Sequence, residues 1–280
     1  MANGTFLWIN AHSRYYSLMQ KLGQHFLKNK AALQKIADAL ELREGDTVVE
    51  IGPGHGELTE LLLTSAKKIA VTAIEKDRNF IAPLQEKFAT EPTHGAFEVI
   101  EGDALKLLKG MPGNYKIAGN IPYYITGKLL RVLSELPQKP ERTVLLVQRE
   151  VAERICAKPP AMNRLAASVQ FWAEPKIIGL VPKEQFSPPP KVDSAIVLLK
   201  TIVPAKKMDE ADRYYAAVRA LFAQPRKTIL NNLSAVRDLD GKKADKRKIT
   251  EDLQHLSVSP LNRPQNLSIT DLSAIAKTFF

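Results

Sequence analysis

The chain has 280 residues, which predicts one large domain or two modest ones and excludes both a mini-protein and a long repeat array. Hydrophobic residues make up 45% of the sequence and charged residues 25%, so the chain can bury an ordinary globular core. The formal net charge of +10 favours a polyanionic partner, either nucleic acid or a membrane surface, or else a solvated basic face.

The cysteine count and the apolar segments indicate the compartment. Cys156 is the only cysteine, so neither an intramolecular disulfide nor a cysteine-based metal site can form. His55 and His94 have no second ligand at a spacing that suits a metal. No stretch approaches about 18 consecutive apolar residues, and residues 1–20 lack the hydrophobic region of a signal peptide. We therefore expect a cytoplasmic protein without a membrane segment or a metal.

The first half of the chain alternates between helix and strand. A helix is predicted over residues 30–41, where apolar residues recur at helical spacing behind Asn29, a suitable N-cap. Five short apolar or β-branched runs predict strands at residues 47–51, 69–75, 97–101, 115–119 and 143–147. Helical spacing predicts helices from residue 58 onward, over 80–88 and over 128–136. Because strands that alternate with helices form parallel sheets covered on both faces, the predicted fold class is α/β.

The pattern changes after Gln148. Helices are predicted at 151–156 and 165–172, and the proline-rich segment 186–191 can be neither a helix interior nor a central strand. A last strand is predicted at 194–200. From residue 205 onward only helical spacing remains, and basic residues concentrate there. A small, basic helical domain is therefore expected at the C-terminal end.

A glycine-rich turn follows the first predicted strand. Gly52, Gly54 and Gly56 precede a helix, and glycines allow a tight turn in which the free N–H groups of the helix face a ligand. Glu75 ends the next strand 23 positions after Gly52, near the spacing of roughly 20 for a carboxylate that accepts both ribose hydroxyls. A dinucleotide enzyme and an S-adenosylmethionine enzyme share this pattern, and the turn alone also fits a structural role.

Two polar segments follow the later strands. Asp103 can accept a hydrogen bond from an adenine amino group, or it can cap a helix. Residues 120–123 read Asn-Ile-Pro-Tyr. An adenine 6-amino group is a poor nucleophile because its lone pair is delocalised, and an amide oxygen with a nearby backbone carbonyl can hold its hydrogens and localise that pair. Tyr123 offers a face for a base taken out of its stack, although a proline turn with a core tyrosine is the alternative.

These motifs resemble the KsgA (RsmA) family of ribosomal RNA small-subunit adenine dimethyltransferases. The matching segments occur in order, at residues 22–27, 50–59, 75–77, 102–104, 119–125, 148–152, 186–195 and 263–268. The resemblance implies a class I, Rossmann-like methyltransferase with a seven-stranded, mostly parallel sheet and a small all-α C-terminal domain. We expect an N-terminal extension at 1–19, an S-adenosylmethionine-dependent domain at 20–203 and a helical RNA-docking domain at 204–280.

The resemblance also implies roles for single residues. Those expected to bind S-adenosylmethionine, the methyl donor, are Gln24, His25, Leu27, Gly52, Gly54, Gly56, Glu75, Lys76, Asp103, Ala104 and Asn120. Asn120 and the carbonyl of Ile121 would engage the target amine, Pro122 would stiffen the turn, and Tyr123 and Phe186 would sandwich the flipped adenine. Arg226 and Lys227 would contact RNA.

The product implied by the family is two adjacent dimethyladenosines in the hairpin loop near the 3′ end of small-subunit (16S) rRNA. The expected partner is a pre-30S particle, bound by a monomer with a role in subunit assembly. Direct transfer from a sulfonium needs no metal. Pro225 stands where the family usually has an arginine, and Asn163 where it usually has a glycine.

Three alternatives remain. The first is a large-subunit rRNA adenine methyltransferase of the macrolide-resistance type, which Pro53 and Tyr124 disfavour. The second is a non-catalytic ribosome-assembly or nucleic-acid-binding factor, which the intact motifs disfavour. The third is a DNA adenine methyltransferase, which the helical tail and the order of the motifs disfavour.

Overall fold

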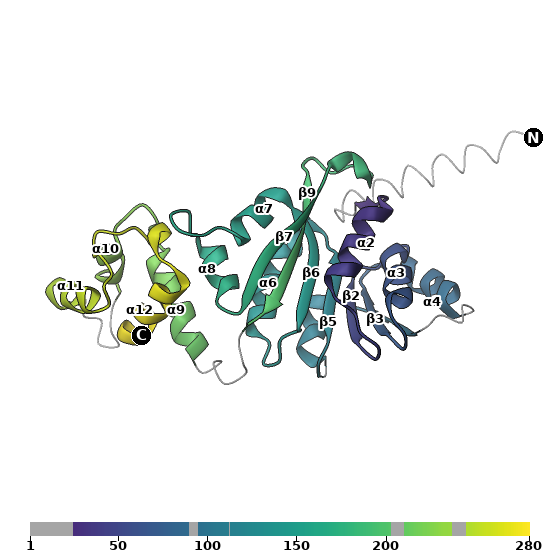
Figure 1. Cartoon of the computed structure of the whole chain (residues 1–280), viewed down its shortest axis with the longest axis horizontal. Coiled ribbons are helices and arrows are strands. Elements are labelled where there is room, and N and C mark those ends of the chain that lie inside the picture. The colour runs from purple at the N-terminus through teal and green to yellow at the C-terminus, as the bar shows by residue number, and fades with distance from the viewer. Residues whose placement is uncertain (1–24, 90–94, 112, 203–209, 237–244) are drawn as a thin grey trace, which may run out of the picture. The chain divides into compact units, whose positions relative to one another are not determined.

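The structure is a computed structural model that describes residues 25–89, 95–111, 113–202, 210–236 and 245–280. The chain forms two compact units (Figure 1). Of the described residues, one unit contains those up to Ala152 together with Lys176–Leu199, and the other contains Glu153–Pro175 together with those from Lys200 onward. Residues 153–175 thus pack with the C-terminal helices, although the sequence assigned them to the first domain. The predicted extension at 1–19 lies outside the described residues.

A seven-stranded sheet is the centre of the first unit, with the order β4-β3-β2-β5-β6-β9-β7. The strands are β2 (Thr47–Ile51), β3 (Ala70–Glu75), β4 (Ala96–Glu101), β5 (Lys116–Asn120), β6 (Arg142–Gln148), β7 (Ala173–Val181) and β9 (Ser194–Thr201). The pairs β2–β3, β3–β4, β2–β5 and β5–β6 are parallel. The predicted α/β class and the seven-stranded, mostly parallel sheet are therefore confirmed.

Helices cover this sheet because its central strands are apolar on both faces. In β2, Val48 and Val49 point to opposite faces and are both fully buried. Val48 packs in one core cluster with residues from helices α2 (Lys30–Ala39), α3 (Glu57–Ser65) and α4 (Ile81–Ala89). The short helix α5 (Ala104–Leu107) contacts α6 (Thr126–Glu135).

The order of the strands creates a topological switch point between β2 and β5. From β2 the chain proceeds outward through β3 and β4, then returns to the other side of β2 to form β5 and β6. The loops after β2 and β5 therefore leave the sheet in opposite directions and open a crevice at its carboxyl edge, which is where ligands bind in such folds.

Three strands were not predicted from the sequence. The long strand β7 lies at one edge of the sheet, and the two-residue strands β1 (Phe26–Leu27) and β8 (Phe186–Ser187) form an antiparallel pair. In that pair Leu27 lies opposite Phe186. This small ribbon joins the segment before α2 to the proline-rich segment.

The second unit is helical. It contains α8 (Arg164–Gln170), α9 (Ala211–Leu221), α10 (Ile229–Leu233), α11 (Lys246–His255) and α12 (Ile269–Phe279), and α7 (Arg149–Ile155) ends in it. Tyr214 of α9 is almost fully buried, donates a hydrogen bond to the carbonyl of Ala167 at 2.9 Å and stacks on Phe171. The predicted helical character of the C-terminal part is confirmed for its described residues.

Candidate active site

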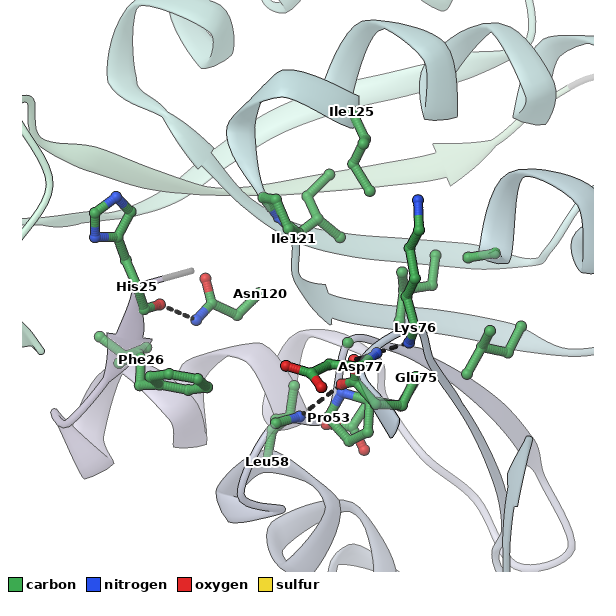
Figure 2. Close-up of a pocket in the computed structure, with 18 of the residues that line it drawn as sticks. His25, Phe26, Pro53, Leu58, Glu75, Lys76, Asp77, Asn120, Ile121 and Ile125 are labelled. Carbon is green, nitrogen blue, oxygen red and sulfur yellow. Dashed lines mark hydrogen bonds between the residues drawn. The ribbon is translucent and has the colours of Figure 1, made fainter. Parts of the chain in front are cut away.

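A cavity of about 430 Å³ lies at the carboxyl ends of β2, β3, β4 and β5 (Figure 2). Four loops line it, each following one of these strands, and the segment 25–27 closes one side. The lining residues predicted from sequence are His25, Leu27, Gly52, Gly54, Glu75, Lys76, Asp103, Ala104, Asn120, Ile121, Pro122 and Tyr123. The volume lies within the range of small-molecule and cofactor sites.

Gly54 shows why the turn after β2 requires glycine. Its φ of +57° belongs to the left-handed region, and a Cβ atom at this position would lie 2.7 Å from the ring of Phe26. Its N–H group donates to Oε2 of Glu75 at 3.3 Å (Figure 2). The backbone of the glycine turn therefore fits closely against the Phe26 ring of β1 and the Glu75 carboxylate at the end of β3.

Glu75 is buried at the end of β3 and accepts three backbone hydrogen bonds. Besides the bond from Gly54, its Oε1 atom accepts from the N–H groups of Lys76 and Asp77, both at 2.8 Å. Burial raises the pKa of Glu75 above its ordinary value, and the three N–H groups act in the opposite direction. A carboxylate has about four acceptor positions, so one remains for a ligand hydroxyl.

Asp103 caps a helix, which is one of the two roles that the sequence left open. Its Oδ1 atom accepts from the N–H group of Leu105 at 3.0 Å and so caps α5. Its Oδ2 atom lies 3.6 Å from Nζ of Lys76, which is largely exposed. The capping bond thus holds the carboxylate at the wall of the cavity, with its second oxygen available to a ligand donor.

Asn120 presents a free acceptor to the cavity. Its Nδ2 atom donates to the backbone carbonyl of His25 at 2.8 Å (Figure 2). Because a carbonyl oxygen can only accept, the NH₂ group must face His25, and the Oδ1 atom faces away from it. Among the described residues no hydrogen bond reaches this Oδ1 atom, and none reaches the carbonyl of Ile121 from another backbone group. Within the described part of the chain, two acceptors at the end of β5 therefore have no hydrogen-bond partner.

Tyr123 lies beside these acceptors and is held in place. Its hydroxyl group is hydrogen-bonded to Oγ of Ser194 at 2.6 Å, and its ring stacks on that of His25 with centroids 6.0 Å apart. Nδ1 of His25 is in turn 2.8 Å from the carbonyl of Pro188. Burial raises the pKa of Tyr123, so the hydroxyl keeps its proton at neutral pH. The ring is anchored as a rigid wall.

Two of the predicted site residues do not line the cavity, and one lies outside the described residues. Phe186 is only 3% exposed and packs in the core with Leu27 and Leu33, because its side chain points to the apolar face of the β1–β8 ribbon. The predicted sandwich with Tyr123 is therefore not formed in this structure. Gly56 instead occupies the left-handed position that starts α3. Gln24 lies outside the described residues.

Arg226 and Lys227, the predicted RNA contacts, are exposed in the loop before α10 of the second unit. No group of three histidine, cysteine, aspartate or glutamate side chains suited to a metal is found in the described part of the chain. Of the helices that the structure describes, none has the length and apolarity needed to cross a membrane.

A pair of residues behind the glycine turn was missed from the sequence. Glu50 is 1% exposed, lies in β2 and borders the cavity, and Thr59 of α3 donates a hydrogen bond to its Oε2 atom at 2.6 Å. Burial raises the pKa of Glu50 to about 8, so the group is protonated at neutral pH. The sequence feature that could have revealed Glu50 is its position as the acidic residue in the otherwise apolar run Thr47–Ile51.

Fold and site together define the class of protein. The last strand, β9, lies between β6 and β7, which separates this sheet from the six-stranded dinucleotide-binding fold. The glycine turn, the acidic residue that ends the next strand and the acceptors at the end of β5 meet in one cavity. The chain is a Rossmann-like methyltransferase, of the class whose methyl donor is S-adenosylmethionine.

Comparison with known proteins gives the family. Residues 16–269 match the family model described as ribosomal RNA adenine dimethylase, and the chain belongs to this family. "Ribosomal RNA small subunit methyltransferase A" of Dehalococcoides mccartyi strain CBDB1 is 40% identical, over 89% of this chain and 84% of the relative. The protein of the same name from Moorella thermoacetica is 36% identical, over 91% of this chain and 90% of the relative.

Two solved structures are also similar. A dimethyladenosine transferase from Plasmodium falciparum is 30% identical, with a TM-score of 0.78 over 91% of this chain and 100% of that chain. The 23S rRNA methyltransferase ErmE is 26% identical, with a TM-score of 0.72 over 91% of this chain and 99% of that chain. The similarity therefore extends across nearly the whole length of both proteins.

Proposed function

We propose that this chain transfers methyl groups from S-adenosylmethionine to the 6-amino groups of two adjacent adenosines, in the hairpin loop near the 3′ end of small-subunit rRNA. The names of the relatives from Dehalococcoides and Moorella support the small subunit as the target. The observation that carries the proposed chemistry is the orientation of Asn120, whose amide nitrogen is bonded to His25 so that its oxygen is left to accept.

The cavity suits S-adenosylmethionine. Glu75 retains one acceptor position for a ribose hydroxyl, and Asp103 has an oxygen free of its capping bond for the adenine amino group. The turn at Gly52 and Gly54 brings bare backbone to the wall of the cavity, where it can surround the methionine part. When bound, the cofactor supplies an electrophilic methyl group on a sulfonium that already carries its leaving group.

The residues after β5 would prepare the nucleophile. Oδ1 of Asn120 accepts one hydrogen of the target amine and the carbonyl of Ile121 accepts the other, so the nitrogen lone pair is localised and directed at the methyl group. Tyr123 supports the plane of the flipped base, with its ring fixed through Ser194. After transfer the amine is positively charged and loses its proton without a dedicated base. The rate enhancement comes mainly from positioning.

The proposed partner is the pre-30S particle, bound by a monomeric enzyme in the cytoplasm with a second role in subunit assembly. Exposed cations of the helical unit, among them Arg226 and Lys227, would contact RNA phosphates and fix the orientation of the substrate. Hairpin loops suit this chemistry because their bases cost less to unstack.

The test replaces the acceptor. We expect Asn120→Ala to lower kcat on unmethylated small subunits by about a hundredfold or more, because one preorganised hydrogen-bonding partner of the transition state is lost. Gln34→Ala is the matched control, since Gln34 also donates an amide hydrogen bond at 2.8 Å but lies on the exposed face of α2. Near-normal turnover by a folded Asn120→Ala enzyme would refute the amine-holding role.

A further inference from the structure

Tyr124 differs from the tyrosine before it. Tyr123 is anchored through its hydroxyl group and its ring, whereas no hydrogen bond or ring contact to Tyr124 is found in the described part of the chain. Tyr124 is 59% exposed, yet it borders the cavity. A large aromatic ring is thus presented to solvent beside the proposed adenine position, with nothing in the described protein to account for its place there.

The surface next to Tyr124 is open at Gly127. The 3-10 helix η3 (Tyr123–Ile125) continues directly into α6, so Gly127 and Lys128 lie three and four residues further along the same exposed face. A Cβ atom added at Gly127 would meet nothing within 4 Å, and its φ is not in the left-handed region. Neither packing nor backbone conformation requires glycine here, and its effect is to leave bare backbone beside the tyrosine.

Lys128 supplies charge at the same place. Its side chain is exposed, and among the described residues it makes no ion pair, unlike Arg131 one turn further on, which is bonded to Glu135. Because α6 follows β5, its first turn lies at the carboxyl edge of the sheet, where the cavity opens. An aromatic face, an open backbone and a cation with no ion pair to any described residue therefore adjoin the mouth of the cavity.

We propose that Tyr124, Gly127 and Lys128 form a nucleotide subsite that holds the RNA residue next to the adenosine being methylated. The ring of Tyr124 stacks on the neighbouring base, Gly127 lets the strand approach the helix closely, and Lys128 contacts a phosphate. Stacking on an aromatic ring is tolerant of base identity and suits unpaired loop nucleotides. The proposal rests on the proposed function, since it supposes an adenosine in the cavity.

The test compares kinetics with cofactor binding. Tyr124→Ala is expected to lower kcat/KM for unmethylated small subunits about tenfold or more, the loss typical of one base-stacking contact, while calorimetric affinity for S-adenosylmethionine stays unchanged. Tyr124→Phe, which keeps the ring, is expected to restore most of that loss. Lys128→Ala is expected to reduce the steepness with which the logarithm of the binding constant for the particle falls with the logarithm of the salt concentration, by about one unit of slope. Lys67→Ala is its matched control, because Lys67 is exposed just before β3, at the amino end of the strand, whereas the cavity lies at the carboxyl ends.

The outcomes separate this proposal from the function on which it rests. A wild-type enzyme that methylates small subunits, with Tyr124→Ala equal to it, would overturn the subsite alone. Loss of cofactor affinity in Tyr124→Ala would also overturn it, because the ring would then belong to the cofactor wall. A wild-type enzyme that modifies no small-subunit RNA would refute the proposed function, whatever the variants do.

Discussion

Replacement of Glu50 by glutamine tests the electrostatics behind the glycine turn. Glu50 is almost fully buried in β2, receives a hydrogen bond from Thr59, and has its pKa raised from 4.5 to about 8 by burial. Glutamine has nearly the same shape and keeps an oxygen that can accept the bond from Thr59. It cannot ionise, so the variant removes the titration and retains the packing.

The sign and size of the effect follow from proton binding. Between pH 4.5 and pH 8 the folded protein holds a proton on Glu50 that the unfolded chain has lost, so the free energy of unfolding falls as the pH rises through this window. Each pH unit in the window changes that free energy by about 1.4 kcal/mol. From pH 5.5 to pH 8.5 the wild type therefore loses roughly 3 kcal/mol through Glu50, and Glu50→Gln does not.

Urea denaturation of both proteins at pH 5.5 and pH 8.5 measures this difference. From pH 5.5 to pH 8.5, the free energy of unfolding of the variant should rise by roughly 3 kcal/mol relative to that of the wild type. The contributions of other titrating groups cancel because both proteins contain them. A constant difference in the free energy of unfolding would refute the assignment of a protonated Glu50. If the wild type instead became more stable than the variant as the pH rises, the pKa of Glu50 would be lowered in the folded protein and not raised.

Three further predictions concern the cofactor turn, the core and the RNA surface. Gly54→Ala should weaken S-adenosylmethionine binding at least about tenfold by calorimetry, because the alanine side chain would clash with the ring of Phe26 in β1. Gly113→Ala is the control and should leave this affinity unchanged, because Gly113 has a similar positive φ but lies away from the cavity. Phe186→Leu should lower the free energy of unfolding by up to about 1.5 kcal/mol and change kcat/KM little, because Phe186 packs in the core. A large loss of kcat without a loss of stability would instead show that the Phe186 ring contacts the adenine. Charge reversal at Arg226 and Lys227 should reduce the salt slope of particle binding by about one ion each, and an unchanged slope would remove both residues from the phosphate contacts.

Most of the fold could be predicted because its strands are short apolar runs that end in distinctive turns. The run Thr47–Ile51 before three glycines is an example, and the structure confirms it as β2. Strand β7 was missed because Pro175 lies within it, which argues against a strand, and because an edge strand has a weak burial pattern. Strands β1 and β8 have two residues each, too few for any periodicity.

The residues of the site could be predicted better than their orientations. Glycine spacing and the residues at strand ends located Gly54, Glu75 and Asn120, all of which line the cavity. Sequence could not show that Phe186 points into the core, because a two-residue strand gives no indication of which face is buried. It also could not show that Ser194 anchors Tyr123, since that hydrogen bond joins positions 71 residues apart.

The most direct test of the central claim is to map the methyl groups transferred from labelled S-adenosylmethionine to unmethylated small ribosomal subunits, with large subunits and bare DNA as parallel substrates. The proposed function predicts two methyl groups on each of two adjacent adenosines near the 3′ end of the small-subunit rRNA, and none on the other substrates. Label in large-subunit RNA or DNA, or tight binding to the small subunit without any transfer, would contradict it.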